Sequence, residues 1–145
     1  MRFIKIQIIF LAAVLFSFSA IAGTDKDLFS CVAGEWEIAE NERIKTGHII
    51  FDGKGRYEMH ENCQDGTGVA IKGEYRIYQD SEPARIDLCL QDCGNPGSEW
   101  TTRFGIIRMK SDDEIEIFTS PDGNYPDDFP GDNTSEYSMM LRRKK

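Results

Sequence analysis

The stretch IIFDGKGRYEM, residues 49–59, holds two runs of alternating apolar and polar side chains on either side of a glycine-rich turn. A three-residue loop with Gly55 in the left-handed conformation places Phe51 opposite Tyr57. A slip of one residue would turn the apolar side chains of one run toward the polar side chains of the other. The stretch therefore predicts an antiparallel hairpin with one apolar face.

The same period of two continues from Gly34 onward, and turn residues recur about every ten positions, as in antiparallel all-β domains. Strands are predicted at residues 35–39, 47–51, 56–62, 69–79, 85–91, 101–109, 114–119 and 136–143, and a short helix within 25–32. The links are short, so consecutive strands are expected to be neighbours. Eight antiparallel strands in this order can close into an up-and-down β-barrel, which leaves no exposed edge.

One side of each predicted strand is apolar and forms the expected lining of the barrel. The lining residues expected to contact a ligand are Trp36, Phe51, Tyr57, Met59, Tyr75, Ile77, Leu88, Phe104, Ile106, Tyr137 and Met139. An eight-stranded barrel is just wide enough either to hold one small apolar ligand or to be filled by its own side chains. Both states of the interior are consistent with this lining.

The N-terminal segment has the pattern of a secretory signal peptide. Arg2 and Lys5 precede an apolar run over residues 8–18, and small residues follow at 20–22. The run is shorter than the ~20 residues that a membrane-spanning helix needs, so no membrane span is expected in the mature chain. We therefore expect a signal peptide over residues 1–22, a mature domain over 23–145, and a periplasmic or secreted location in a bacterium.

The mature chain is strongly acidic. The predicted leader removes Arg2 and Lys5 and no acidic residue, so 15 of the 17 basic residues remain against 25 acidic ones, a formal net charge of −10. Phosphate binding needs an excess of Lys and Arg, so the charge argues against nucleic acid as a partner. It favours a basic protein partner, attracted to the acidic loop over residues 120–133.

Four cysteines in an exported chain predict two disulfides. In meander order the predicted third and fifth strands end at the same rim, so Cys63 is expected to pair with Cys93. This leaves Cys31 for Cys89, and the other two connectivities stay open. A zinc site is not indicated, because only one close pair of cysteines occurs.

No metal or other cofactor is predicted. The hairpin register places His48 and His60 opposite each other on the outer face, where two imidazoles could hold zinc or copper. A stable site needs a third or fourth ligand, so a solvated pair is the preferred interpretation. The aspartates of the loop at 120–133 could attract calcium, but its prolines favour a stiff loop over the barrel mouth.

The sequence also argues against an enzyme. It contains no nucleophile, metalloprotease or phosphate-loop motif. Its paired carboxylates, such as Asp112 and Asp113, lie in predicted turns without apolar surroundings that would raise a pKa for acid catalysis. No catalytic residue is therefore predicted.

Gly34-Glu35-Trp36 opens the first predicted strand, and this Gly-x-Trp resembles the opening signature of the lipocalins. The resemblance implies that the helix closes one barrel end and that a basic residue of the last strand, here Arg143, lies over Trp36. It leaves packing of Trp36 in the core without such a contact as the alternative.

A broader similarity covers residues 32–145. The segments AGEWEI, IIFDGKGRYEM, KGEYRIYQDSEPARIDL, FGIIRMKSDDEIEIF and MLRRKK are similar, in this order, to an uncharacterised bacterial lipocalin-like domain family known mainly from planctomycete proteins. The chain departs from that family at YPDDF, where Tyr125 replaces the usual arginine. Because the family has no established activity, the resemblance implies the fold and not a reaction.

The expected function is therefore binding of a small apolar ligand in the barrel of an exported protein. The alternative is an interaction protein, for example an inhibitor of a lysozyme or a protease, which acts through the acidic loop at 120–133.

Overall fold

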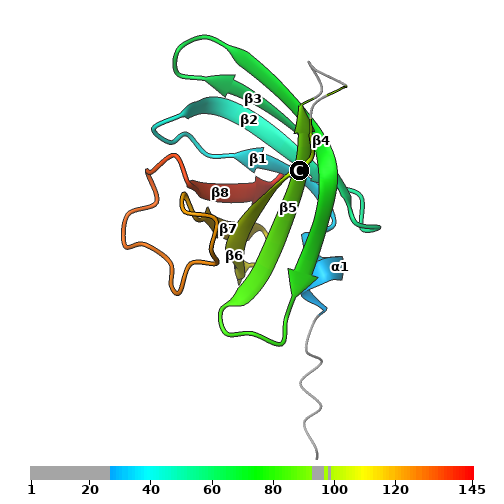
Figure 1. Ribbon diagram of the computed structural model, residues 1–145. Helices are drawn as coiled ribbons and strands as arrows, with labels where there is room; N and C mark the ends of the chain where they lie inside the picture. Colours follow the sequence, from blue (N-terminus) through cyan, green and yellow to red (C-terminus); the bar gives the residue numbers. More distant parts are fainter. Residues whose placement is uncertain (1–26, 93–96, 98) are drawn as a thin grey trace, which may run out of the picture.

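Figure 1 shows the computed structural model of the chain, which describes residues 27–92, 97 and 99–145. The predicted signal peptide and Cys93 lie outside the described residues. Antiparallel strands close into one barrel of eight, in which neighbours in sequence pair and β8 pairs with β1. The predicted all-β up-and-down barrel with a short N-terminal helix is confirmed.

The elements follow the predicted order. They are α1 (Leu28–Val32), β1 (Gly34–Ile38), β2 (Ile44–Phe51), β3 (Arg56–Cys63), β4 (Gly68–Tyr78), β5 (Ala84–Asp92), β6 (Thr101–Ser111), β7 (Glu114–Thr119) and β8 (Ser138–Arg143). The largest difference is the early start of β2, because a bulge between Ile44 and Thr46 lets its pairing with β3 continue to Cys63.

The β2–β3 hairpin has the predicted register. Phe51 lies opposite Tyr57, and Gly55 has a φ of 99°, in the left-handed region that a side chain would disfavour. The turn is held by Asp52, whose Oδ1 accepts a hydrogen bond from the backbone N–H of Lys54 at 2.7 Å. The turn chemistry and the apolar pattern therefore select the same pairing.

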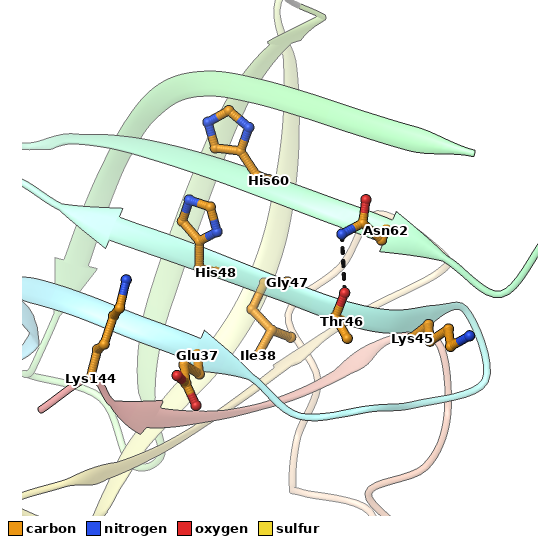
Figure 2. Close-up of a pocket in the computed structure, with 9 residues that line it drawn as sticks. All are labelled: Glu37, Ile38, Lys45, Thr46, Gly47, His48, His60, Asn62 and Lys144. Carbon is orange, nitrogen blue, oxygen red and sulfur yellow. Dashed lines mark hydrogen bonds between the residues drawn. The ribbon is translucent and has the colours of Figure 1, made fainter. Parts of the chain in front are cut away.

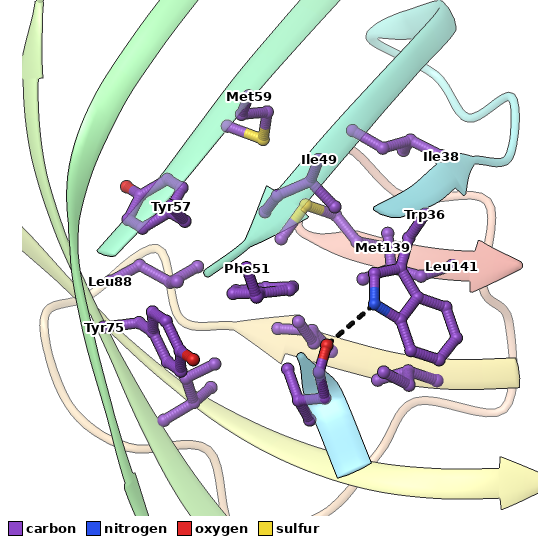
Figure 3. Close-up of a cluster of buried hydrophobic side chains, with 14 of the residues drawn as sticks. Trp36, Ile38, Ile49, Phe51, Tyr57, Met59, Tyr75, Leu88, Met139 and Leu141 are labelled. Atoms are coloured by element: carbon purple, nitrogen blue, oxygen red, sulfur yellow. Dashed lines mark hydrogen bonds between the residues drawn. The ribbon is translucent and has the colours of Figure 1, made fainter. Parts of the chain in front are cut away.

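The middle of the barrel is filled by its own side chains (Figure 3). Trp36, Phe51 and Tyr75 are each at most 2% exposed, and the rings of Phe51 and Tyr75 meet edge to face at 4.9 Å. The predicted lining residues in this core are Trp36, Phe51, Tyr57, Met59, Tyr75, Leu88 and Met139, with Ile77 packed against it. The sequence left open whether the barrel interior is hollow or filled; in the structure its middle is filled by side chains.

The predicted phase of β6 is wrong. Ile107 lies opposite the core residue Ile117, which turns Ile107 inward and places Phe104 and Ile106 on the outer side of the strand. Apolar side chains can also lie on the outer side of β6, because the segment between β7 and β8 covers them and shields them from water. The rings of Phe104 and Tyr125 pack there with centroids 5.1 Å apart.

This segment, the acidic loop of the sequence analysis, packs against the outer wall of the barrel. The guanidinium of Arg85 lies 4.6 Å from the centre of the Tyr125 ring, and that of Arg108 lies 4.1 Å from the centre of the Phe129 ring. The predicted position over the barrel mouth holds only for its first residues, which line a pocket at the rim.

Helix α1 closes the barrel end where β1 begins. Its Phe29 ring stacks on Tyr75 with centroids 5.0 Å apart. The indole Nε1 of Trp36 donates a hydrogen bond to the carbonyl oxygen of Val32 at 2.8 Å (Figure 3). Arg143 lies over the Trp36 ring, so the contact implied by the lipocalin resemblance is present.

Candidate functional site at the open barrel end

Two adjoining pockets lie at the barrel end opposite α1, where β1, β3, β5 and β7 end and the other strands begin. One, of about 590 Å³, is lined by Glu42, Arg43, Cys63, Gln64, Asp65, Val69 and Glu136. The other, of about 370 Å³, is lined by Arg43, Thr102, Arg103, Phe104, Thr119, Ser120, Pro121, Gly123, Glu136 and Tyr137. Arg43 and Glu136 belong to both pockets. We call the combined region the open mouth.

A buried ion pair lies at the open mouth. Glu61 is on the inward side of β3, with its side chain 0% exposed, and Arg43 is 27% exposed. Arg43 Nη2 donates a hydrogen bond to Glu61 Oε1 at 2.9 Å, and Nη1 donates to Oε2. Burial lowers the pKa of Arg43, but the hydrogen bonds and charge of Glu61 outweigh burial and raise that pKa above its usual value. The pair therefore fixes a cation at the mouth.

Asn41 holds the backbone that carries Arg43. Its buried side-chain Oδ1 accepts hydrogen bonds from the backbone N–H groups of Arg43 at 2.9 Å and Ile44 at 2.7 Å. Its Nδ2 donates to the carbonyl oxygen of Ser138 at 2.9 Å. The link between β1 and β2 is thus tied to the start of β8, which makes this side of the mouth a rigid wall.

Arg103 is a second cation at the open mouth. It lies opposite the core residue Leu88, so its position is on the inward side of β6. Strand β7 ends at Thr119, before it would pair with Arg103, and the side chain is exposed at the rim. Within the described part of the chain Arg103 forms no salt bridge. An exposed guanidinium at this position can pair with an anionic group of a ligand.

The open mouth combines apolar and charged surface. Val69 packs against the hydrophobic core, and Cys63 is buried beside it in the lining of the larger pocket. Tyr137 contributes a partly exposed ring to the smaller pocket, next to Arg103. This arrangement suits a small molecule with one apolar part and one polar or anionic part.

Sequence reasoning located the mouth only in part. Of the residues expected to contact a ligand, Phe104 and Tyr137 line it, Ile106 is buried on the outer side of β6, and the others fill or border the core. Glu61 was not among the residues expected in the lining. Its parity with the inward residues Tyr57 and Met59 was the signal that could have placed it inside.

Cys31, Cys63 and Cys89 form no disulfide in the described part of the chain. Cys31 lies in α1 at the closed end, and Cys89 Sγ lies 3.4 Å from Thr102 Oγ1, so the expected bond between Cys31 and Cys89 is not formed. The expected partner of Cys63, Cys93, lies outside the described residues.

Two aspartates of the loop accept hydrogen bonds from the backbone of the loop itself. Asp122 Oδ1 accepts a hydrogen bond from the N–H of Asn124, and Asp132 Oδ1 accepts one from the N–H of Thr134. In both cases the pKa of the aspartate is lowered, mainly by a hydrogen bond from a Ser or Thr hydroxyl. These carboxylates stabilise the loop as it stands in the structure.

Comparison of this chain with family models, with curated proteins and with solved structures gave no match. Within residues 27–92, 97 and 99–145, no helix has the length and apolar character needed to cross a membrane. The open mouth is therefore interpreted from the chemistry of its own residues.

Proposed function

We propose that this chain is an exported, lipocalin-like, non-enzymatic protein that binds one small apolar or amphiphilic molecule at the open mouth. The observation that carries the proposal is the pair of adjoining pockets that share Arg43 and Glu136 as a common wall. Each pocket has a volume in the range of known small-molecule sites. The sequence resemblance to lipocalin-like proteins supports the same reading.

The proposed binding position is the mouth, because the centre of the barrel is already filled. The middle layer is occupied by Trp36, Phe51 and Tyr75, and a deeper ligand would have to displace these rings from close packing. The mouth needs no such displacement. Its apolar surface at Val69 and Cys63 would contact the apolar part of the ligand, and Arg103 would pair with its polar end.

The direct experiment is mass spectrometry of small molecules extracted from natively purified mature protein. It is combined with calorimetry against a panel of single-chain amphiphiles. Val69→Arg would fill the larger pocket and should lower the affinity about tenfold or more. Ala70→Arg is the matched control, because it adds the same side chain one residue along, at an exposed position. Equal binding by both variants, or no ligand in either assay, would remove the proposal.

A second candidate is an interaction protein whose acidic loop docks a basic protein. The observation in its favour is the anchoring of the loop, through Tyr125 and Phe129, which holds Asp127 and Asp128 exposed on a fixed surface. Capture of lysozyme by the parent chain, with loss of capture in Asp127→Asn/Asp128→Asn, is the expected result. Equal capture by both would exclude this surface.

We propose further that the chain is exported after cleavage at residue 22 and that Cys63 pairs with Cys93 in the oxidising compartment. N-terminal sequencing of the secreted product checks the first point. Peptide mapping without reductant checks the second, and a free Cys63 in the exported protein would contradict it.

A further inference from the structure

A separate pocket of about 430 Å³ lies on the outer face of β1, β2 and β3 and shares no lining residue with the two pockets of the open mouth (Figure 2). Its floor includes both histidines of the chain, His48 and His60. Figure 2 shows the two imidazoles one above the other on neighbouring strands. The function proposed for the open mouth does not account for this pocket.

The strand register places three potential metal ligands in one row. His48 on β2 lies directly opposite His60 on β3, as the sequence predicted. On its other side, His48 lies directly opposite Glu37 on β1. Side chains directly opposite each other in neighbouring strands have Cβ atoms about 5 Å apart. The carboxylate in this row was missed because the sequence did not reveal the β1–β2 register.

The two imidazoles are close enough to share one metal ion. Their rings stack with centroids 4.9 Å apart and an interplanar angle of 20°. Metal–nitrogen bonds of about 2.0–2.1 Å require ring nitrogens on the order of 3 Å apart, which rotation of two surface side chains can reach. Among the described residues, no group of three or more His, Cys, Asp or Glu side chains is placed to hold a metal ion, so Glu37 must also rotate toward His48.

In the strand register, the nearest cation to the row is Arg142 on β8, which lies directly opposite Glu37 on the side away from the histidines, so a metal ion would compete with this arginine for the Glu37 carboxylate. Lys144 lines the pocket, but its Nζ pairs with Glu35 Oε1 at 2.8 Å, which offsets its charge. Lys45, the other lysine of the lining, is exposed to solvent on β2. The predicted mature domain has a formal net charge of −10, so its overall field attracts cations.

We propose that His48 and His60 chelate a divalent copper ion through their imidazoles, with Glu37 as the carboxylate ligand and water in the remaining position. Copper(II) is the favoured occupant because its tetragonal geometry accepts two nitrogens and oxygen ligands, and because it binds such donors more tightly than the other first-row divalent ions. Zinc binds the same row more weakly.

The test is titration of the mature protein with Cu²⁺, followed by calorimetry and electron paramagnetic resonance. Coupling to two imidazole nitrogens is the expected spectrum. His48→Gln and His60→Gln should each weaken binding about tenfold or more, and Glu37→Gln by several-fold. Asn62→Ala, which lines the same pocket outside the row, is the matched control and should bind as the parent does.

Equal Cu²⁺ affinity in the parent and the His48→Gln/His60→Gln variant would overturn the site. So would coupling to a single nitrogen. An unchanged affinity in Glu37→Gln would overturn the role of Glu37. Equal melting temperatures of the metal-free variants show that any loss of binding comes from the ligands and not from the fold.

Discussion

The guanidinium of Arg143 lies 4.1 Å from the centre of the Trp36 ring and thereby joins the last strand of the barrel to the first. Its Nη1 and Nη2 donate hydrogen bonds to the carbonyl oxygens of Ala33 at 3.2 Å and Cys31 at 2.9 Å. One side chain therefore satisfies carbonyl groups at the end of α1 and covers the central tryptophan.

Replacement of Arg143 by Ala should lower the free energy of unfolding by about 2 kcal/mol, from the lost cation–π contact and hydrogen bonds. Arg143→Lys keeps a charge but lacks the planar fork, so it should recover less than half of the loss. Urea unfolding of both variants gives the measurement. A Lys variant as stable as the parent would show that charge alone matters.

The pair formed by Arg43 and Glu61 should behave as a buried charge pair. Arg43→Ala leaves the Glu61 carboxylate buried without its partner and should cost about 3 kcal/mol or more. The double variant Arg43→Met/Glu61→Leu removes both charges and should recover most of that loss. Chemical denaturation of the two variants and the parent tests this. If the double variant has no higher free energy of unfolding than Arg43→Ala, the unpaired charge of Glu61 is not the cause of the lost stability.

Tyr125 should make the fold sensitive to alkali. Burial, and then the hydrogen bond and charge of Asp87, raise the pKa of its phenol well above the usual value of about 10. The unfolded chain then ionises before the folded chain does, so stability is retained below about pH 10 and falls as the pH rises further. Tyr125→Phe should show a shallower alkaline loss in thermal unfolding. Identical pH curves would contradict this assignment.

Gly73 should tolerate no side chain. A Cβ atom at this position would lie 1.9 Å from the carbonyl oxygen of Cys89 on the neighbouring strand, so β4 and β5 would have to separate. Gly73→Ala should therefore destabilise the barrel by about 2 kcal/mol or more. Gly131→Ala is the control, because no atom lies within 4 Å of its Cβ position. Thermal unfolding should show a loss for the first variant only.

The hairpin of β2 and β3 was predictable because two independent signals agreed. The left-handed Gly55 and the alternation that pairs Phe51 with Tyr57 select one register. Alternation failed to predict the orientation of β6, because this strand has apolar residues on both faces: Ile107 points inward, and Phe104 and Ile106 point outward. Only the cover supplied by Tyr125, from a loop distant in sequence, explains the outer apolar face.

The open mouth was less predictable than the barrel. Arg43 lies in the link between β1 and β2, where strand periodicity carries no information about direction. Glu61 has the inward parity, but alternation alone does not predict a buried carboxylate, because its partner Arg43 comes from outside the strands. Long-range pairing of charges is decided by the closed fold and not by local sequence patterns.

Both described ends of the chain lie at the same end of the barrel, since β1 begins and β8 ends beside α1. A mechanical load applied between these two ends would separate β8 from β1 by breaking their backbone hydrogen bonds one after another. It would not load all of these hydrogen bonds at the same time. The first contact to bear that load is the one between Glu35 and Lys144, where the Lys144 backbone N–H donates to the Glu35 carbonyl oxygen at 3.0 Å. The ladder pair of Trp36 and Arg143 follows. Under tension these terminal contacts between β1 and β8 would be loaded before the core, so they would contribute to the force needed to open the barrel.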